Sequence, residues 1–232
     1  MIGFRMVLPV VAAAGFYAAL VRPRLLRWGA TSEEANRAYP GDELIPEATG
    51  QSTMAVTLPA PPERVWPWLV QMGHGRAGWY SWDRLDNIGH RSAERIVSEW
   101  QNVKAGDRMV TVPNEASWFT VAMLDEPRTL VLQDDLQIPT GKPFDPRGTY
   151  PSAYTEGIWA FHLQPVEGGQ TRLVVRTRGR GKPRVLDRIT AVALGEPAHF
   201  IMQHRQFQNL RRRLQAEPAN ADRPRVTAGS GD

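Results

Sequence analysis

The stretch QMGHGRAGWYSWDRLDN, residues 71–87, is the first place in the chain where residue types and spacing suggest chemistry. Trp79, Trp82, Asp83 and Asp86 follow one another at i, i+3, i+4 and i+7, so on a helix they share one face. A structural reading has the tryptophans close the open end of a sheet, while the aspartates bind neighbouring arginines or backbone N–H groups.

A functional reading makes the same stretch the mouth of a ligand pocket. Trp79, Tyr80 and Trp82 would then be flat apolar walls that carry N–H or O–H groups. Asp83 or Asp86 would be a polar anchor, or a base that takes a proton from the ligand. The sequence leaves both readings open.

The segment Gly73–Gly78 within this stretch matches the G-x-G-x-x-G dinucleotide pattern. That fingerprint needs a strand before it and a helix after it. Here the spacing of Val65, Trp68, Leu69 and Met72 predicts a helix before the glycines. We therefore expect the glycines to end that helix and link it to the next one, and we expect no cofactor.

Outside this stretch the candidates for chemistry are few. The five histidines, at positions 74, 90, 162, 199 and 204, have no spacing that would chelate a metal, so no metal site is expected. His204 falls on the apolar face of the predicted last helix, as a satisfied core residue or as a third catalytic candidate beside Asp83 and Asp86. Trp159 and His162 lie on one predicted strand but on opposite faces, so at most one of them faces inward. Trp159 and His204 complete the predicted ligand-binding set.

The N-terminal segment predicts a membrane anchor over residues 1–24. Residues 6–21, MVLPVVAAAGFYAALV, carry no charge, and with Ile2–Phe4 they approach the roughly 20 residues that cross a bilayer. A cleaved signal peptide is the alternative, but Arg22, Arg24 and Arg27 follow at once, as in a stop-transfer flank. The excess of arginine on the C-terminal side predicts a single pass with the globular domain in the cytoplasm.

Composition excludes some chemistry and leaves other partners open. The 232 residues include no cysteine, so disulfides and cysteine nucleophiles are absent. The 28 Lys and Arg against 24 Asp and Glu include local runs such as Arg176, Arg178 and Arg180. We expect these runs on a solvated face rather than on phosphates, and no recognised nucleic-acid motif accompanies them.

The rest of the chain predicts one α+β domain. A connector over residues 25–51 precedes a domain over 52–215, and a disordered tail over 216–232 follows it. Turn residues separate the predicted elements, and short turns indicate an antiparallel sheet. The expected strands are 52–58, 107–112, 118–124, 129–133, 157–163 and 171–178, and the last helix is expected over about 197–215. Residues 134–156 are too long for an ordinary turn and are expected to form a lid or a tether.

Five short strings carry a resemblance to a known family. RWGAT (27–31), PGDELIP (40–46), APPERVWPWLVQMG (60–73), RAGWYSWDRLDN (76–87) and AGDRM (105–109) resemble the actinobacterial, membrane-anchored branch of the SRPBCC superfamily of START-like, polyketide cyclase-like proteins. The resemblance implies a helix-grip fold, in which a curved antiparallel sheet of about six or seven strands wraps a long C-terminal helix. It also implies an apolar cavity between the sheet and that helix.

Three functions are compatible with these features. The leading hypothesis is a membrane-tethered domain that binds or transports a hydrophobic small molecule or lipid. The second is a cyclase- or dehydratase-type enzyme that uses a cavity Asp or His for proton transfer. The third is a basic accessory protein, which is the least supported. The sequence leaves the oligomeric state open.

Overall fold

The computed structural model describes residue 12 and residues 15–221. Its strands are β1 (Gly50–Leu58), β2 (Arg108–Val110), β3 (Trp118–Asp125), β4 (Thr129–Gln137), β5 (Tyr154–Val166) and β6 (Gln170–Lys182). Its helices and helical turns are η1 (Tyr17–Val21), α2 (Arg22–Leu26), α3 (Ser32–Asn36), η2 (Asp42–Leu44), α4 (Pro62–Val70), α5 (Asp83–Asp86), η3 (Ser98–Trp100), η4 (Pro113–Glu115), α6 (Arg184–Thr190), η5 (Ala191–Gly195) and α7 (Glu196–Ala221).

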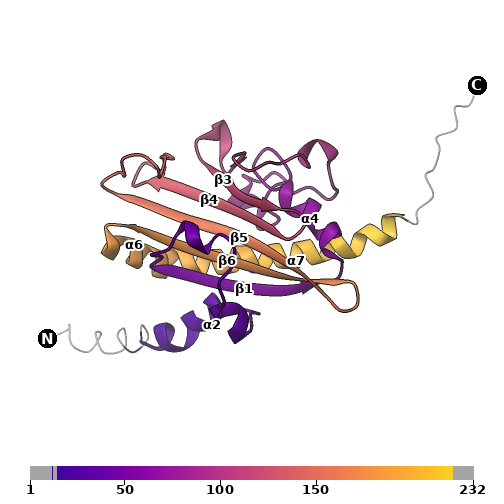
Figure 1. Cartoon of the computed structure of the whole chain (residues 1–232), viewed down its shortest axis with the longest axis horizontal. Coiled ribbons are helices and arrows are strands. Elements are labelled where there is room, and N and C mark those ends of the chain that lie inside the picture. The colour runs from indigo at the N-terminus through magenta and orange to yellow at the C-terminus, as the bar shows by residue number, and fades with distance from the viewer. Residues whose placement is uncertain (1–11, 13–14, 222–232) are drawn as a thin grey trace, which may run out of the picture.

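The six strands form one antiparallel sheet in the order β1-β6-β5-β4-β3-β2. Each predicted strand is found, and the long C-terminal helix packs across the sheet (Figure 1). The α+β class, the antiparallel sheet and the long last helix are confirmed, and this arrangement is consistent with a helix-grip fold.

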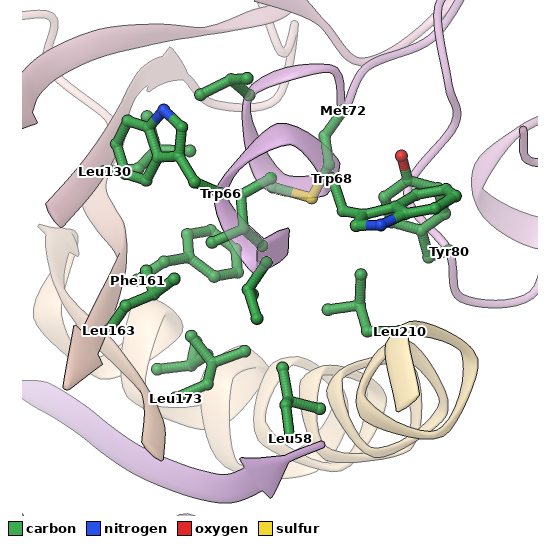
Figure 2. Packing of buried hydrophobic residues seen from close by; sticks show 14 of the residues in the cluster. Leu58, Trp66, Trp68, Met72, Tyr80, Leu130, Phe161, Leu163, Leu173 and Leu210 are labelled. Carbon is green, nitrogen blue, oxygen red and sulfur yellow. The ribbon is translucent and has the colours of Figure 1, made fainter. Parts of the chain in front are cut away.

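The inner face of the sheet is the face that packs on α4 and α7. Figure 2 shows Leu58, Phe161 and Leu173 of the sheet pointing toward Trp68 of α4 and Leu210 of α7. These side chains are buried, and burying a large apolar side chain contributes about 1.5 to 3 kcal/mol. The core therefore fixes the two helices on this face.

The outer face of the sheet is covered by the connector between α2 and β1. Arg172, Arg176, Arg178 and Arg180 alternate along β6 and therefore all point to this face. Arg172 pairs with Glu34, and Arg176 and Arg178 pair with Asp42. The expectation of a solvated arginine face is wrong for this run, because these guanidinium groups hold the connector on the sheet.

The glycine segment and the residues after it differ from the predicted pair of helices. Gly73 and Gly78 exchange backbone hydrogen bonds of 3.2 and 3.0 Å, which closes a small loop after α4. Tyr80 has a φ of 58°, in the left-handed region, so no helix can run through it. The predicted helical stripe of Trp79, Trp82, Asp83 and Asp86 is wrong, since only the four residues of α5 are helical.

The two ends of the chain meet the predictions in part. No helix in residues 15–221 is long and apolar enough to cross a bilayer. More than half of the predicted anchor over residues 1–24 lies outside the described residues, so the anchor stays a prediction. At the other end α7 continues to Ala221, past the predicted start of the tail at residue 216, and residues 222–232 lie outside the description.

Candidate functional site

Within the stretch over residues 71–87, Trp79 and Tyr80 are part of the hydrophobic core. The Tyr80 hydroxyl accepts a hydrogen bond of 2.7 Å from the Gln71 amide, and burial raises the pKa of this tyrosine. Trp79 is buried as well, and its backbone carbonyl accepts from Gln206 of α7 at 2.9 Å. Both aromatic residues therefore tie the segment after α4 to the last helix.

The exposed half of the stretch is the short helix α5 and the residue before it. Trp82 precedes α5 and leaves 44% of its surface exposed, with the guanidinium of Arg205 lying 4.9 Å from its ring. Asp83 accepts hydrogen bonds from the backbone N–H and the hydroxyl of Ser92, at 3.1 and 2.6 Å. Asp83 thereby holds the loop between α5 and Ser92 in place.

Asp86 is different from Asp83. Its two carboxyl oxygens are buried and find no hydrogen-bond partner among the described residues. Burial, and next the nearby charge of Asp83, raise the pKa of this carboxyl. Asp86 thus differs from Asp83, whose carboxylate is held by Ser92.

Trp79 and Trp159 do meet, on the inner face of the sheet. Their ring centroids are 5.7 Å apart, and Phe119 of β3 lies 5.7 and 5.8 Å from the two rings. The Trp159 indole N–H donates to Gln203 of α7 at 3.0 Å. Trp159 therefore faces inward while His162 stacks on Tyr39 on the outer face, and the prediction that the two lie on opposite faces agrees with this placement.

His204 is not in this cluster. Its ring lies edge-on to Trp28 at 4.6 Å and parallel to Phe200 at 5.9 Å, so it packs against the segment that leads into the connector. His199, one turn earlier on α7, faces Trp159 edge-on at 6.5 Å. Burial lowers the pKa of His199 to about 4, so this imidazole is neutral at pH 7.

A groove of about 1050 Å³ lies on the outer face of the sheet, away from the predicted site residues. β3 and β4 supply its floor through Trp118, Gln133 and Asp135, and the 138–153 loop supplies a wall through Phe144 and Tyr150. Its volume matches the upper end of the range for small-molecule pockets, about 300 to 1000 Å³. A small-molecule ligand could fit in a groove of this size.

The 138–153 loop, which forms the wall of the groove, is hydrogen-bonded to β4. The Phe144 N–H donates to the Asp135 carbonyl at 2.9 Å, and the Gln137 N–H donates to Lys142 at 2.9 Å. The Phe144 ring meets the rings of Tyr150 and Tyr154 at 5.4 and 5.8 Å. The loop predicted as a lid or tether is therefore shorter than expected and packs on the outer face.

Of the two carboxyl groups on the floor of the groove, Glu156 forms an ion pair and, among the residues that the structure describes, Asp135 does not. Glu156, opposite Asp135 in the β4–β5 register, bonds Arg180 and accepts from the Tyr150 hydroxyl at 3.0 Å. Asp135 accepts only the Gln133 amide, at 3.2 Å to each oxygen, and has no ion-pair partner within the described residues. Burial first, and then the charges of Glu156 and Asp145, raise the pKa of Asp135 to about 6.

The preceding residue, Asp134, points to the inner face. Its carboxyl lies against the bare backbone of β5, where a side chain on Gly157 would come within 3.2 Å of the Asp134 Oδ1 atom. Burial, and next the charge of Asp135, raise the pKa of Asp134 to about 7. Two adjacent aspartates thus titrate near neutrality on opposite faces of one strand.

The groove, Asp134 and Asp135 were not predicted from the sequence. The signal was present, since Asp134-Asp135 directly follows the predicted strand over 129–133. The predicted strand ended four residues before β4 does, because charged residues are unusual inside strands. The wall of the groove gave no such signal, because the loop side chains reach it only through tertiary folding.

Comparison with known proteins gives structural neighbours but no family. No family description and no curated protein matches the chain. Among solved structures, a protein from Nitrosospira multiformis is 14% identical, covers 73% of this chain and 99% of its own, and has a TM-score of 0.44. Protein SA2116 from Staphylococcus aureus is 11% identical over 73% and 97% of the two chains, with a TM-score of 0.43. CalU16 from Micromonospora echinospora is 14% identical over 73% and 86%, with a TM-score of 0.30.

Proposed function

We propose that this chain is a membrane-tethered domain that binds a hydrophobic small molecule or lipid in the groove of the outer face. The observation that carries the proposal is the groove itself, about 1050 Å³ with Trp118, Phe144 and Tyr150 on its walls. Aromatic walls with a few convergent polar groups are typical of small-molecule sites. The tether is the predicted anchor over residues 1–24.

The unpaired carboxyl of Asp135 defines the polar end of the ligand. A hydroxyl, amide or ammonium group would donate a hydrogen bond to it, and a ligand carboxylate would be repelled. The rings of Phe144 and Tyr150, both from the 138–153 loop, supply the apolar contact. The ligand is therefore expected to have an apolar body and one hydrogen-bond donor.

Binding of N-phenyl-1-naphthylamine, which fluoresces more strongly in apolar sites and carries one N–H donor, tests this proposal. Phe144→Ala removes a wall of the groove, and Phe119→Ala removes a matched ring from the inner face. We expect Phe144→Ala to weaken binding at least about tenfold, or about 1.4 kcal/mol, and Phe119→Ala to change it little. Thermal unfolding of both variants is measured alongside, because losing a packed ring also costs stability.

The opposite ranking would place the ligand between the sheet and α7 and contradict the groove. Wild-type affinity in both variants would contradict binding at either face. Organic extraction of protein purified from its own host, followed by mass spectrometry, then names the natural ligand.

A second candidate function is proton-transfer catalysis of the cyclase or dehydratase type. It is favoured by the carboxyl of Asp135, whose pKa of about 6 suits a general acid or base near neutral pH. The extracted ligand, or its precursor, is incubated with the protein and followed by chromatography and mass spectrometry. An enzyme changes the compound, and Asp135→Asn abolishes that change while binding persists; a carrier returns the compound unaltered.

A further inference from the structure

The segment between β6 and the last helix exposes an unusual number of aliphatic side chains. Val185, Leu186 and Ile189 of α6 leave 73%, 49% and 59% of their surfaces exposed, and Leu194 of η5 leaves 70%. Singly exposed apolar residues are ordinary, but a contiguous group marks an interaction surface. The spacing of the first three places them on one side of α6, and the wider π-helical turn of η5 carries Leu194 on from Ile189.

The start of the described chain lies beside this segment. The Tyr17 hydroxyl donates to the Val192 carbonyl at 3.5 Å, and Arg22 forms two hydrogen bonds, of 2.6 and 2.7 Å, with the Glu196 carboxylate. Phe16 and Leu20, on this N-terminal helix, are also largely exposed. In Figure 1, α6 lies at the end of the molecule that the N-terminal helical segment approaches. We call Val185, Leu186, Ile189 and Leu194 the α6 face, and Phe16 and Leu20 lie in the run that leads to it.

Cationic side chains flank the α6 face. Arg184 and Arg188 of α6 are exposed, as are Arg24 of α2 and Arg27 at the end of that helix. The acidic groups nearby are engaged: Glu196 is paired with Arg22, and Asp187 accepts from the Thr49 hydroxyl at 3.4 Å. Apolar residues bordered by arginines suit a bilayer surface, where the aliphatic groups enter the acyl boundary and the guanidinium groups meet lipid phosphates.

We propose that the α6 face lies on the surface of an anionic lipid bilayer. The uncharged N-terminal run favours lipid over a protein as the partner of this face. Its uncharged run over residues 6–21 leads directly into the helix that borders the face, so an anchored chain would hold this face against the membrane. The inference rests on the tether within the proposed function and adds a second, peripheral contact that orients the domain.

Single-cysteine labelling tests the contact on the full chain, which has no cysteine of its own. Ile189→Cys and Leu194→Cys are labelled with nitrobenzoxadiazole, and Val166→Cys is the control, because Val166 is 40% exposed at the opposite end of the long β5–β6 pair. The proteins are reconstituted in vesicles of phosphatidylcholine and phosphatidylglycerol, with and without brominated acyl chains. We expect a blue shift and bromine quenching at positions 189 and 194, and neither at position 166.

Each outcome separates the two proposals. Proteins that float with the vesicles but show no quenching at positions 189 and 194 overturn the α6 face and leave the tether standing. A blue shift without bromine quenching means that protein covers the face, which also overturns the inference. Proteins that fail to float overturn both the tether and the face. Ligand binding is scored independently by the Phe144 and Phe119 variants.

Discussion

Two neighbouring aspartates show how strongly position controls the behaviour of one residue type. Asp134 and Asp135 share a strand, yet one lies against the backbone of Gly157 and the other faces an open groove. Burial raises the pKa of both, to about 7 and about 6. Asp125, at the exposed end of β3, pairs instead with Arg128. Local packing, more than residue type, decides which carboxyls can exchange protons at neutral pH.

Asp134 should make stability fall as pH rises. Its pKa is near 3.8 in the unfolded chain and about 7 in the folded chain, so between these values only the folded state keeps the proton. Stability is therefore greatest at low pH and is lost as pH rises toward 7, after which the deficit is constant. We expect Asp134→Asn to stabilise the protein by up to about 4 kcal/mol at pH 8 and by less at pH 5, measured by thermal unfolding.

Asp125→Asn is the matched control for this prediction. Its ion pair with Arg128 is exposed, and such pairs contribute about 0 to 1 kcal/mol. Equal effects of Asp134→Asn at pH 5 and pH 8 would show that the Asp134 carboxyl does not titrate in this range.

At the scale of elements, the outer face depends on one buried arginine. The Arg176 guanidinium donates to both oxygens of Asp42, at 3.1 and 3.0 Å, and to the backbone carbonyls of Ala35 and Arg37, at 3.1 and 2.8 Å. It also lies over the ring of Tyr39 at 5.2 Å. A single side chain of β6 thus holds two turns of the connector.

Removing that guanidinium should release the connector. Arg176→Met keeps much of the volume but removes both guanidinium hydrogen bonds to Asp42 and those to the carbonyls of Ala35 and Arg37. We expect a loss of about 3 to 5 kcal/mol in the free energy of unfolding, measured in urea. Arg128→Met, which removes an exposed arginine, should cost less than about 1 kcal/mol. Equal costs for the two substitutions would mean that the connector does not depend on Arg176.

The whole molecule joins a folded domain to a predicted anchor. The described helix over η1 and α2 packs on the beginning of α7 through Arg22 and Glu196, so the predicted anchor leads directly into the domain. The proposed ligand groove lies on the outer face of the sheet, and the proposed bilayer contact lies on α6 and η5. The two proposed functions therefore use different surfaces.

Retention of residues 1–24 with the domain in the cytoplasm is the prediction at this scale. Its reason is the excess of arginine after the apolar run, at Arg22, Arg24 and Arg27. Membrane fractionation of intact cells, and protease treatment of cells and of inverted vesicles, check it. The domain should stay with the membrane and be cut only in inverted vesicles. Soluble protein would contradict the anchor, and digestion from outside whole cells would contradict the orientation.

Sequence alone was sufficient for the six strands, for α4 and for the last helix, and for their order. Alternation along 52–58 predicted β1, and the apolar spacing after Pro197 predicted α7, because both signals depend on residues a few positions apart. Short turns between strands predicted the antiparallel sheet for the same reason. Alternation within one strand also predicted that Trp159 and His162 lie on opposite faces.

Tertiary structure decided which of these residues form a site. Trp79 is found against Trp159 while Trp82 lies outside, because the left-handed backbone at Tyr80 ends the helical spacing that seemed to unite them. The groove exists because strand register sets Asp135 opposite Glu156 and because the 138–153 loop folds back onto β4. Loop packing depends on contacts between residues far apart in the sequence, and spacing within one short segment does not specify those contacts.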